Sequence, residues 1–342
     1  MNDIHISKDN IPEFKANWNE ALAICQKYGI REIAFGGDLF QSRVSQTLDV
    51  LLTVHDALLQ AAAAGIDITL AEGNHDLIDQ EALRGYCHIY DQHPCVTVID
   101  DFLTLDNPRW DFVLHMMSYF PENGSFTGRL QALAAGSIVG ERLNYLYIHQ
   151  GINGALATPA EDELPTHIFD SFDKVFVGHY HNRSIVEGTE IEYIGASRQH
   201  NFGEREDMGY TILFSDGSYE FIQNQVNIRY HVIEVAAEQV DVHLFDRIDE
   251  IKADERYRVK VKVLGKSTDT IDKKRILDAG ANKVEVISED TQVIEAPEAG
   301  VLEKFDSARI RQSYEDFCSK RSVEDVSLGL SYLSKIEVSC GA

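Results

Sequence analysis

Hydrophobic residues recur along the first two thirds of this chain in two alternating patterns. Short apolar runs of the length of a buried strand are separated by stretches in which apolar residues recur every three or four positions, as in a helix. Phe14, Trp18, Leu22 and Cys25 form one helical pattern, which precedes a strand pattern at 31–35. This alternation is typical of a layered α/β domain.

The same alternation continues downstream and predicts further elements. We expect a helix over 45–64 and strands at 66–70, 112–115, 145–148, 174–177, 191–194, 211–214 and 220–222. After about residue 228, the pattern predicts a strand at 257–264, a helix at 270–279 and a strand at 283–287. Two helical apolar stripes then follow Pro297 and Gly300. We therefore expect a large domain at 1–228, a small βαβ-type domain at 229–296, and a linker with C-terminal helices at 297–342.

Composition narrows the class of protein. The chain has 342 residues, of which 44% are hydrophobic, enough for a core. No apolar run approaches the roughly 20 residues that a membrane span needs. The five cysteines form no CxxC pair and the N-terminus has no secretory pattern, so we expect free thiols and a cytoplasmic protein. The net charge of -25 opposes strong nucleic-acid binding by this chain alone, so any nucleic acid would need a local basic surface or a basic partner to bind.

Five polar motifs fall where predicted strands give way to loops. They are Asp3-x-His5, Gly37-Asp38, Gly73-Asn74-His75-Asp76, His149 and Gly178-His179-Tyr180-His181. Each motif alone is weak, because Gly-Asp is commonly a turn and a lone histidine is more often hydrogen-bonded than a ligand. Together they supply the carboxylate, amide and imidazole groups that suit two adjacent Mn²⁺, Fe²⁺ or Zn²⁺ ions. Two such ions are a recurring device for phosphodiester hydrolysis.

The order of these motifs resembles the calcineurin-like metallophosphoesterases over about residues 1–225. The resemblance implies an α/β fold, a layered β-sandwich flanked by helices, with a small α+β capping domain and a C-terminal helical pair. It also implies two divalent ions, which we expect to be Mn²⁺. One ion would be held by Asp3, His5, Asp38 and His181, and the other by Asp38, Asn74, His149 and His179.

The same resemblance assigns roles to two further residues. His75 would stabilise the transition state or protonate the leaving oxygen, a task that suits an imidazole. Asp76 would orient His75, and a plain loop-capping carboxylate is an alternative of equal weight.

A downstream stretch narrows the expected substrate. Residues 193–197, 200–204 and 207–210 resemble the end of the catalytic domain in SbcD-type DNA repair exonucleases. The resemblance implies an exonuclease or endonuclease of DNA repair or recombination in a bacterial or phage-infected cell. Residues 229–296 would cap the active site. The helices within 297–342 would dock to an ABC-type coiled-coil ATPase, and a second copy of the chain is a further expected partner.

Several alternatives stay open. Arg43, Arg183, Arg198 and Arg205 are candidates for DNA phosphate contacts, and solvated surface arginines are an equally weighted interpretation. The apolar stripes at the C-terminal end would, in most proteins, be core. The chain as a whole could instead be a small-molecule or phosphoprotein phosphatase of the same superfamily, or a non-catalytic scaffold subunit.

Overall fold

The structure is a computed structural model of the 342-residue chain. It describes residues 1–79, 82–122, 125–157, 163–240, 242–265 and 271–288. The chain divides into two compact units, Met1–Ser288 and Glu289–Ala342. The second unit lies outside the described residues, and with it the predicted linker and C-terminal helices at 297–342.

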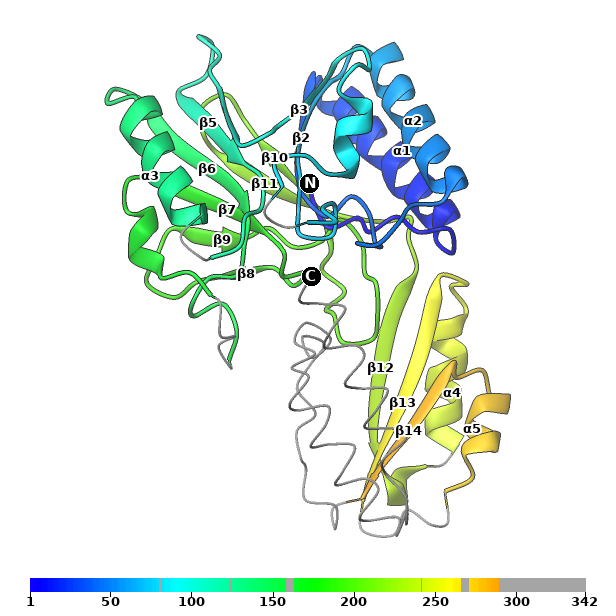
Figure 1. Ribbon diagram of the computed structural model, residues 1–342. Coiled ribbons are helices and arrows are strands. Elements are labelled where there is room, and N and C mark those ends of the chain that lie inside the picture. Colours follow the sequence, from blue (N-terminus) through cyan, green and yellow to red (C-terminus); the bar gives the residue numbers. More distant parts are fainter. Residues whose placement is uncertain (80–81, 123–124, 158–162, 241, 266–270, 289–342) are drawn as a thin grey trace, which may run out of the picture. The chain divides into compact units, whose positions relative to one another are not determined.

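Two helices and a parallel sheet form the N-terminal part of the first unit (Figure 1). Helix α1 (Ile11–Tyr28) has Pro12 in its first turn and ends at Gly29, whose φ of 69° closes the helix in the left-handed conformation. Its apolar face shares one core with helix α2 (Leu48–Ala63) and the sheet. The sheet has the order β1 (Glu32–Gly36), β2 (Asp67–Ala71) and β3 (Val96–Val98), all parallel.

A larger mixed sheet follows in the sequence. Its order is β4 (Phe102–Leu105), β5 (Phe112–Met117), β6 (Leu143–His149), β7 (Lys174–Gly178), β9 (Ile191–Tyr193) and β8 (Ser184–Ile185). Strands β5, β6, β7 and β9 are parallel, whereas β4 and β8 are antiparallel to their neighbours. Strand β5 is buried along its whole length, as expected of a parallel strand covered on both faces. Helix α3 (Ser125–Ser137) packs on one face of this sheet through Phe126, Leu130 and Leu133.

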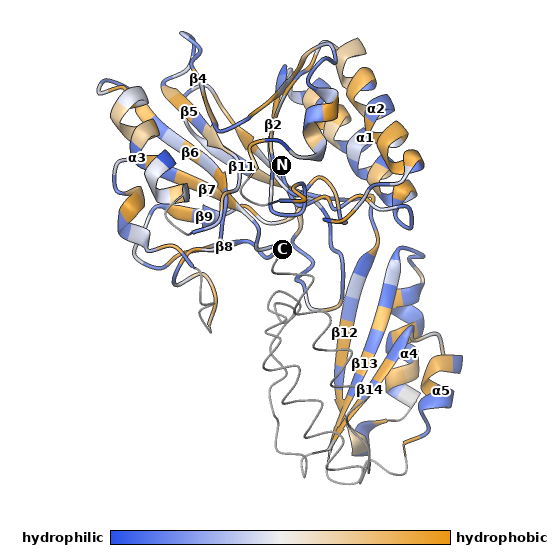
Figure 2. Cartoon of the chain, in the orientation of Figure 1, coloured by the Kyte–Doolittle hydropathy of each residue, from blue (hydrophilic) through white to orange (hydrophobic). Residues whose placement is uncertain are grey.

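The remaining described elements form two smaller sheets. Strands β10 (Gly209–Leu213) and β11 (Tyr219–Gln223) pair as an antiparallel hairpin. A parallel sheet then contains β12 (Arg229–Ala236), β13 (Tyr257–Gly265) and β14 (Lys283–Ser288), with α4 (Val242–Lys252) and α5 (Lys273–Asp278) in the connections. Hydrophobic and polar residues alternate along β13 (Figure 2), and its inward side chains join a core of their own with α4 and α5. Three single-turn helices, η1 (Tyr86–Tyr90), η2 (Thr166–Phe169) and η3 (Ala237–Gln239), lie in loops.

Most expected elements are confirmed to within a few residues, but the expected fold class is wrong. The described strands form a mixed α/β arrangement of four separate sheets with three, two, three and six strands, and not one layered β-sandwich. The reason for this difference is the strand pairing at the edges of two sheets. Strand β1 pairs only with β2 and strand β10 pairs only with β11, so the sheets to which they belong stay unjoined among the described residues.

None of the helices in the described part of the chain has the length and apolar character that crossing a membrane requires.

Candidate metal centre

The five polar motifs come together at the carboxyl ends of strands from two sheets, the three-stranded sheet of β1, β2 and β3 and the six-stranded sheet. Asp38 follows β1, His75 follows β2, His149 ends β6 and His179 follows β7. The N-terminal segment lies alongside the Asp38 loop, where the backbone N–H of Asp3 donates to Gly37 O at 3.0 Å and that of His5 donates to Asp38 O at 3.1 Å. Since the carboxyl ends of parallel strands share one edge, motifs far apart in sequence converge there.

Backbone strain is concentrated at the same place. Among the described residues, five that are not glycine have a positive φ, and four of them are predicted metal ligands: Asp3 (51°), His5 (47°), Asp38 (56°) and His179 (87°). Such conformations cost of the order of 1–3 kcal/mol each and persist where the surroundings enforce them. Their clustering supports the hypothesis of a functional site, and it does so independently of any motif.

Bare glycine backbone allows the loops to approach one another. A Cβ added to Gly37, which has a φ of 94°, would lie 2.6 Å from His149 Nδ1 and 2.8 Å from the Cα of Gly73. A Cβ added to Gly178 would lie 2.8 Å from the same His149 nitrogen. Any side chain at these positions would push the histidine out of the centre.

Asp38 is the hub of the first group of contacts. Its Oδ2 atom lies 3.2 Å from His149 Nε2 and 3.5 Å from His5 Nε2. His5 Nε2 in turn lies 3.1 Å from His181 Nε2. The Oδ1 atom of Asp3 is 3.9 Å from the Nε2 atoms of all three of these histidines.

Asn74 and His179 complete the set of seven predicted ligands. Asn74 Oδ1 lies 3.2 Å from His179 Nδ1, and the His179 ring centroid is 5.3 Å from that of His149. The structure therefore brings together all the side chains that the motifs singled out for metal binding. Their role as ligands stays a prediction.

The chemistry of the donor set fits divalent cations. Asp3 and His149 are fully buried, and Asp38 is only 2% exposed. In the part of the chain that the structure describes, His5 Nδ1 is buried without a hydrogen-bond partner, a costly state unless something else occupies it. Ligand atoms of Asp3, Asp38 and His149 all lie within 4.8 Å of one another, as do those of His5, Asp38 and His75.

Hydrogen bonds outside the centre fix which nitrogen each histidine turns inward. His149 Nδ1 donates to Gly36 O at 2.9 Å, because a carbonyl can only accept. His181 Nδ1 lies 2.7 Å from the Glu204 carboxylate. Both rings therefore present Nε2 to the centre, the arrangement in which a carbonyl or carboxylate behind an imidazole orients it for a metal.

Charges in the centre are strongly coupled. Burial disfavours the ionised form of Asp38, but the neighbouring His149, His5 and His75 together outweigh burial and hold the pKa of Asp38 well below its usual range. Burial likewise disfavours a charged His149, yet Asp38 and Asp3 overcome it and raise the pKa of His149 to about 9. Burial, followed by the charge of His149, lowers the pKa of His179 to about 3. A cation bound here would displace the His149 proton, since a ligating imidazole is neutral.

His75 lies beside the centre, and its backbone holds Asp38. Its N–H donates to Asp38 Oδ1 at 2.9 Å, and its ring centroid is 4.8 Å from that of His5. His75 Nδ1 donates to Gln41 O at 2.8 Å, which leaves Nε2 as the nitrogen for chemistry.

Asp76 has the arrangement of the loop-capping alternative. Its buried carboxylate accepts from the backbone N–H groups of Gly73 at 2.8 Å, Phe40 at 2.9 Å and Leu39 at 3.3 Å. Burial, and then the charge of Asp38, raises the pKa of Asp76 well above its usual value. Asp76 thus joins the Asp38 loop to the Gly73 loop, and the contact that orients His75 comes from Gln41.

Two residues at the centre were not singled out as site residues from the sequence. His200 offers a ring nitrogen within 4.8 Å of those of His5 and His181, and its Nε2 donates to Asp3 O at 2.9 Å. Glu204 contacts His181 as described above. His200 and Glu204 occur in the stretch 200–204, and the resemblance noted for that stretch was the only feature of the sequence that pointed to them. Contacts between residues far apart in sequence leave no periodic pattern.

The predicted DNA-contacting arginines have different surroundings. Arg198 is buried, and its guanidinium donates to Ile4 O at 3.0 and 3.2 Å. Arg183 pairs with Glu192 at 2.9 Å and lies over the Phe221 ring. Arg205 is the most exposed of these three, with a side chain 55% accessible and 3.2 Å from Asp207. The backbone carbonyl of Arg43 accepts from Tyr86 Oη at 3.3 Å.

Comparisons with known proteins do not place the chain in a family. No family model matches it. One solved structure with some likeness is the family 1 b-glucosidase from Thermotoga maritima in complex with isofagomine lactam. It is 12% identical, covers 82% of this chain and 78% of that chain, and has a TM-score of 0.23. A likeness at that score supports no conclusion about fold or function.

The identification as a calcineurin-like metallophosphoesterase of the SbcD type is therefore corrected. It depended on short motifs and their order, no family model matches the chain, and the structural likeness reported above does not support it. What remains is the geometry of the centre, which stands on the residues themselves.

Proposed function

We propose that this chain is a hydrolase of phosphodiesters that uses two divalent metal ions, with Mn²⁺ as the expected metal and DNA as the substrate. The observation that carries the proposal is the convergence of the seven ligand side chains, four of them held at strained backbone positions. Asp3, His5, Asp38 and His181 would hold one ion. Asp38, Asn74, His149 and His179 would hold the other.

The ions, when bound, would supply a deprotonated water at neutral pH and neutralise charge on the phosphoryl oxygens. The chain's own residues supply position and a proton. Glu204 and Gly36 O fix the rings of His181 and His149. His75 donates its Nδ1–H to Gln41 O, so it would act in the doubly protonated form, whose Nε2–H gives a proton to the leaving oxygen and leaves a neutral ring.

The first experiment separates metal binding from turnover. We expect full-length chain with Mn²⁺ to degrade labelled duplex DNA. His75→Ala protein should keep its metal and lose activity by about 10²-fold or more, the usual contribution of a proton donor. Asp38→Ala protein should lose metal and activity together. His55→Ala, which changes a histidine of α2 paired with His93, is the matched control and should cut normally. Normal cleavage by His75→Ala protein would refute the role of His75.

A substrate panel tests the finer part of the proposal. Activity on p-nitrophenyl phosphate with none on duplex or single-stranded DNA would replace the nuclease by a phosphatase. Chain that binds metal and cleaves neither substrate would favour a scaffold. Arg205 is more exposed than Arg183 and Arg198, and Arg205→Ala should weaken DNA binding without changing activity on p-nitrophenyl phosphate.

An ABC-type coiled-coil ATPase is the proposed partner in DNA repair or recombination, in the cytoplasm. The support is electrostatic, because a chain with a net charge of -25 binds DNA better when a second protein supplies the basic surface. The proposed docking residues, 297–342, lie outside the described residues. Co-purification of full-length chain with such an ATPase, lost on deletion of 297–342, would support the assignment, and equal co-purification by both chains would exclude it.

A further inference from the structure

The segment 3–5, which carries two predicted ligands in strained backbone conformations, is held by two sets of hydrogen bonds. Its three backbone N–H groups donate to Gly37 O and Asp38 O at 3.0 to 3.1 Å. Its three backbone carbonyls accept instead from side chains, most of them in the stretch 198–200. Because a side chain can reach a metal only from its own backbone, the groups that hold these carbonyls help to place the ligands.

Arg198 supplies most of the bonds to these carbonyls. Its guanidinium donates to Ile4 O from Nη2 at 3.0 Å and from Nε at 3.2 Å, and Nη2 also lies 3.4 Å from His5 O. Arg198 is only 5% exposed, and burying a charge to bind backbone is costly. A planar fork of donors can bridge adjacent carbonyls, which a single ammonium group does less well. The contacts therefore suit an arginine whose task is to hold this segment.

His200 and Glu204 complete the arrangement. His200 Nε2 donates to Asp3 O at 2.9 Å, because a carbonyl can only accept. Glu204 Oε2 accepts from the backbone N–H of His200 at 2.6 Å, while its Oε1 lies 2.7 Å from His181 Nδ1. One carboxylate therefore fixes both the residue that holds Asp3 and a further predicted ligand.

The contacts of the stretch 198–204 concern one of the two proposed ions. Three of the four ligands assigned to the first ion are in contact with this stretch, namely Asp3, His5 and His181. In the described part of the chain, no hydrogen bond joins the stretch to a ligand assigned to the second ion alone. Loss of these contacts should therefore weaken the first ion and spare the second.

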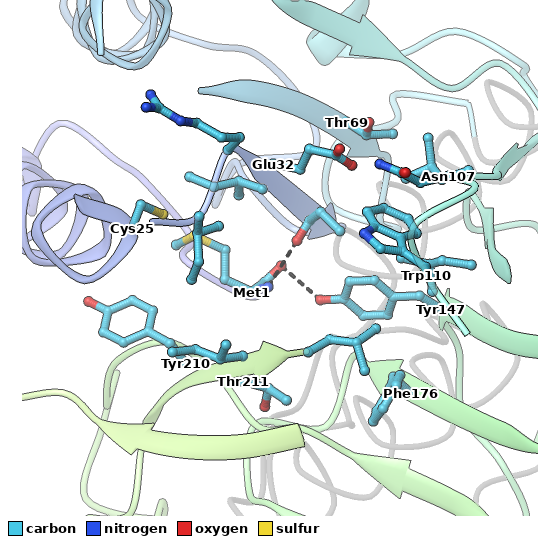
Figure 3. Close-up of a pocket in the computed structure, with 18 of the residues that line it drawn as sticks. Met1, Cys25, Glu32, Thr69, Asn107, Trp110, Tyr147, Phe176, Tyr210 and Thr211 are labelled. Carbon is cyan, nitrogen blue, oxygen red and sulfur yellow. Dashed lines mark hydrogen bonds between the residues drawn. The ribbon is translucent and has the colours of Figure 1, made fainter. Parts of the chain in front are cut away.

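Tyr147 in β6 independently holds the backbone ahead of this segment. Its Oη donates to Met1 O at 2.8 Å, a contact drawn as a dashed line in Figure 3. The Met1 carbonyl also accepts from the Gly36 N–H at 2.9 Å. Changes at Arg198 or His200 leave both bonds intact, so they should loosen the ligand-bearing backbone without freeing the whole N-terminal segment.

We propose that Arg198 and His200 are positioning residues, which raise the affinity of the centre for the first ion by holding Asp3 and His5 in place. The inference deepens the proposed function and rests on its two-ion centre. Holding the strained segment in advance lowers the free energy that ion binding must supply to order it. Arg198, a candidate for DNA contact from the sequence, therefore acts on the protein's own backbone.

Three roles of Arg198 predict different effects of Arg198→Met on the first ion. A guanidinium beside the centre repels a cation, so its charge alone predicts tighter ion binding once it is removed. A role in stability alone predicts no change in ion binding by the folded chain. Positioning predicts weaker binding, by the roughly 10- to 100-fold that is typical of residues that orient metal ligands.

The experiment isolates each ion and measures the Mn²⁺ affinity of full-length chain by electron paramagnetic resonance of the free ion. Asn74→Ala chain lacks a ligand of the second ion, and adding Arg198→Met should weaken the remaining ion by about tenfold or more. His181→Ala chain lacks a ligand of the first ion, and adding Arg198→Met should change the remaining affinity by less than about twofold. Unchanged or tighter binding of the first ion would overturn the proposal.

A matched variant separates positioning from packing. Arg229 is likewise buried and donates to two backbone carbonyls, those of Glu206 and Asn224. Arg229→Met should therefore leave the affinity for the first ion unchanged, and a loss equal to that of Arg198→Met would count against positioning. Arg198→Lys, which keeps a single donor group, should give an intermediate loss and replaces Arg198→Met if that chain does not fold.

Two substitutions at His200 test its part in the arrangement. His200→Gln keeps an amide donor near the position of Nε2, so it should retain the affinity for the first ion that His200→Ala loses. Equal losses in the two variants would mean that the imidazole itself binds the ion, and would overturn the positioning role of His200.

Amide hydrogen exchange in the metal-free chain separates this inference from the proposed function. Arg198→Met should speed exchange of the Ile4 and His5 amides, which donate to Asp38 O, by about tenfold or more, and Arg229→Met should not. Wild-type chain that binds no Mn²⁺ would contradict the two-ion centre, while faster exchange would still show that Arg198 holds the segment. Unchanged exchange would refute the positioning role, whatever the ion content.

Discussion

Strained residues at the metal centre are held in place by their backbone partners. Asp3, His5 and Asp38 each have a positive φ, and the hydrogen bonds from Asp3 to Gly37 and from His5 to Asp38 tie the strained segments together. Each strained residue costs of the order of 1–3 kcal/mol, so the rest of the fold must offset several kcal/mol here. Selection for folding alone would remove such strain, and its retention points to a function.

Asp76 is the residue on which this loop geometry depends most. Asp76→Ala would leave the buried N–H groups of Leu39, Phe40 and Gly73 without their acceptor. We expect a loss of about 2–4 kcal/mol in the free energy of unfolding, measured by urea denaturation. Glu187→Ala, a surface carboxylate, should change it by less than about 0.5 kcal/mol. Equal effects of the two changes would mean that Asp76 does not brace the loops.

His88 should give the protein a pH-dependent contribution to stability. It lies 3.1 Å from Glu72 and 2.8 Å from Asp100. Burial alone would lower its pKa, but the contacts with Glu72 and Asp100 outweigh burial and raise the pKa above its ordinary value. A raised pKa in the folded state means that the stabilisation is complete below the ordinary value and is lost as the pH rises through the raised value.

The measurement compares wild-type chain with His88→Asn. The difference in their free energies of unfolding should be largest below the ordinary histidine pKa of about 6.5. It should shrink as the pH rises through the raised pKa of the folded state, because His88 then becomes neutral in both states. A difference that is constant across this range would show that His88 acts by packing alone.

At the residue scale, the motifs located the seven predicted ligands, because strand ends and short polar motifs are visible in sequence. The role of Glu204 was not predictable, since it depends on a contact with His181 across 23 residues. The arrangement of Asp76 was one of two equally weighted alternatives. Whether the Asp76 carboxylate contacts His75 or backbone N–H groups depends on how two separate loops fold. No local sequence pattern determines that.

At the element scale, substitutions at two glycines distinguish the effect of backbone strain on stability from that of packing. Nothing lies within 4 Å of a Cβ added at Gly29 or Gly128, but only Gly29 has a positive φ. We expect Gly29→Ala to lower the free energy of unfolding by about 1 kcal/mol, because it ends α1 in the left-handed conformation. Gly128→Ala, in the interior of α3, should raise it by about 0.5–1 kcal/mol. Thermal or urea denaturation measures both, and changes of the same sign would contradict the assignment.

Periodicity predicted several elements and missed others, among them the eight-residue strand β12 and the helix α4. Helix α1 was predictable because Phe14, Trp18, Leu22 and Cys25 all face the core. Strand β3 has only three residues, too few for a pattern. Helix α3 contains Gly128 and Gly136, which weaken its helical signal.

At the scale of the whole molecule, the order of strands within sheets was not predictable. Each strand's own sequence says how much of it is buried but not which edge meets which neighbour. The placement of β1 and β10 in different sheets therefore became visible only in the structure, and with it the division of the described strands into four sheets. Long-range pairing of this kind depends on the balance of all contacts at once.

Metal removal should destabilise the whole first unit. Several titratable groups are buried together in the centre, and ions that bind only the folded state add to its stability. We expect EDTA to lower the melting temperature of Mn²⁺-loaded chain by several degrees, and Asp38→Ala protein to show no change on the same treatment. A wild-type melting temperature that is insensitive to EDTA and to added Mn²⁺ would mean that the centre holds no metal.

The manganese content of the purified chain tests the paired-metal centre most directly. Full-length chain equilibrated with Mn²⁺ and then desalted should carry about two ions per chain by elemental analysis. Asp38→Ala protein, which lacks the carboxylate that reaches both groups of ligands, should carry fewer than about one. Wild-type chain without bound manganese, or Asp38→Ala protein that retains both ions, would contradict the assignment of this centre.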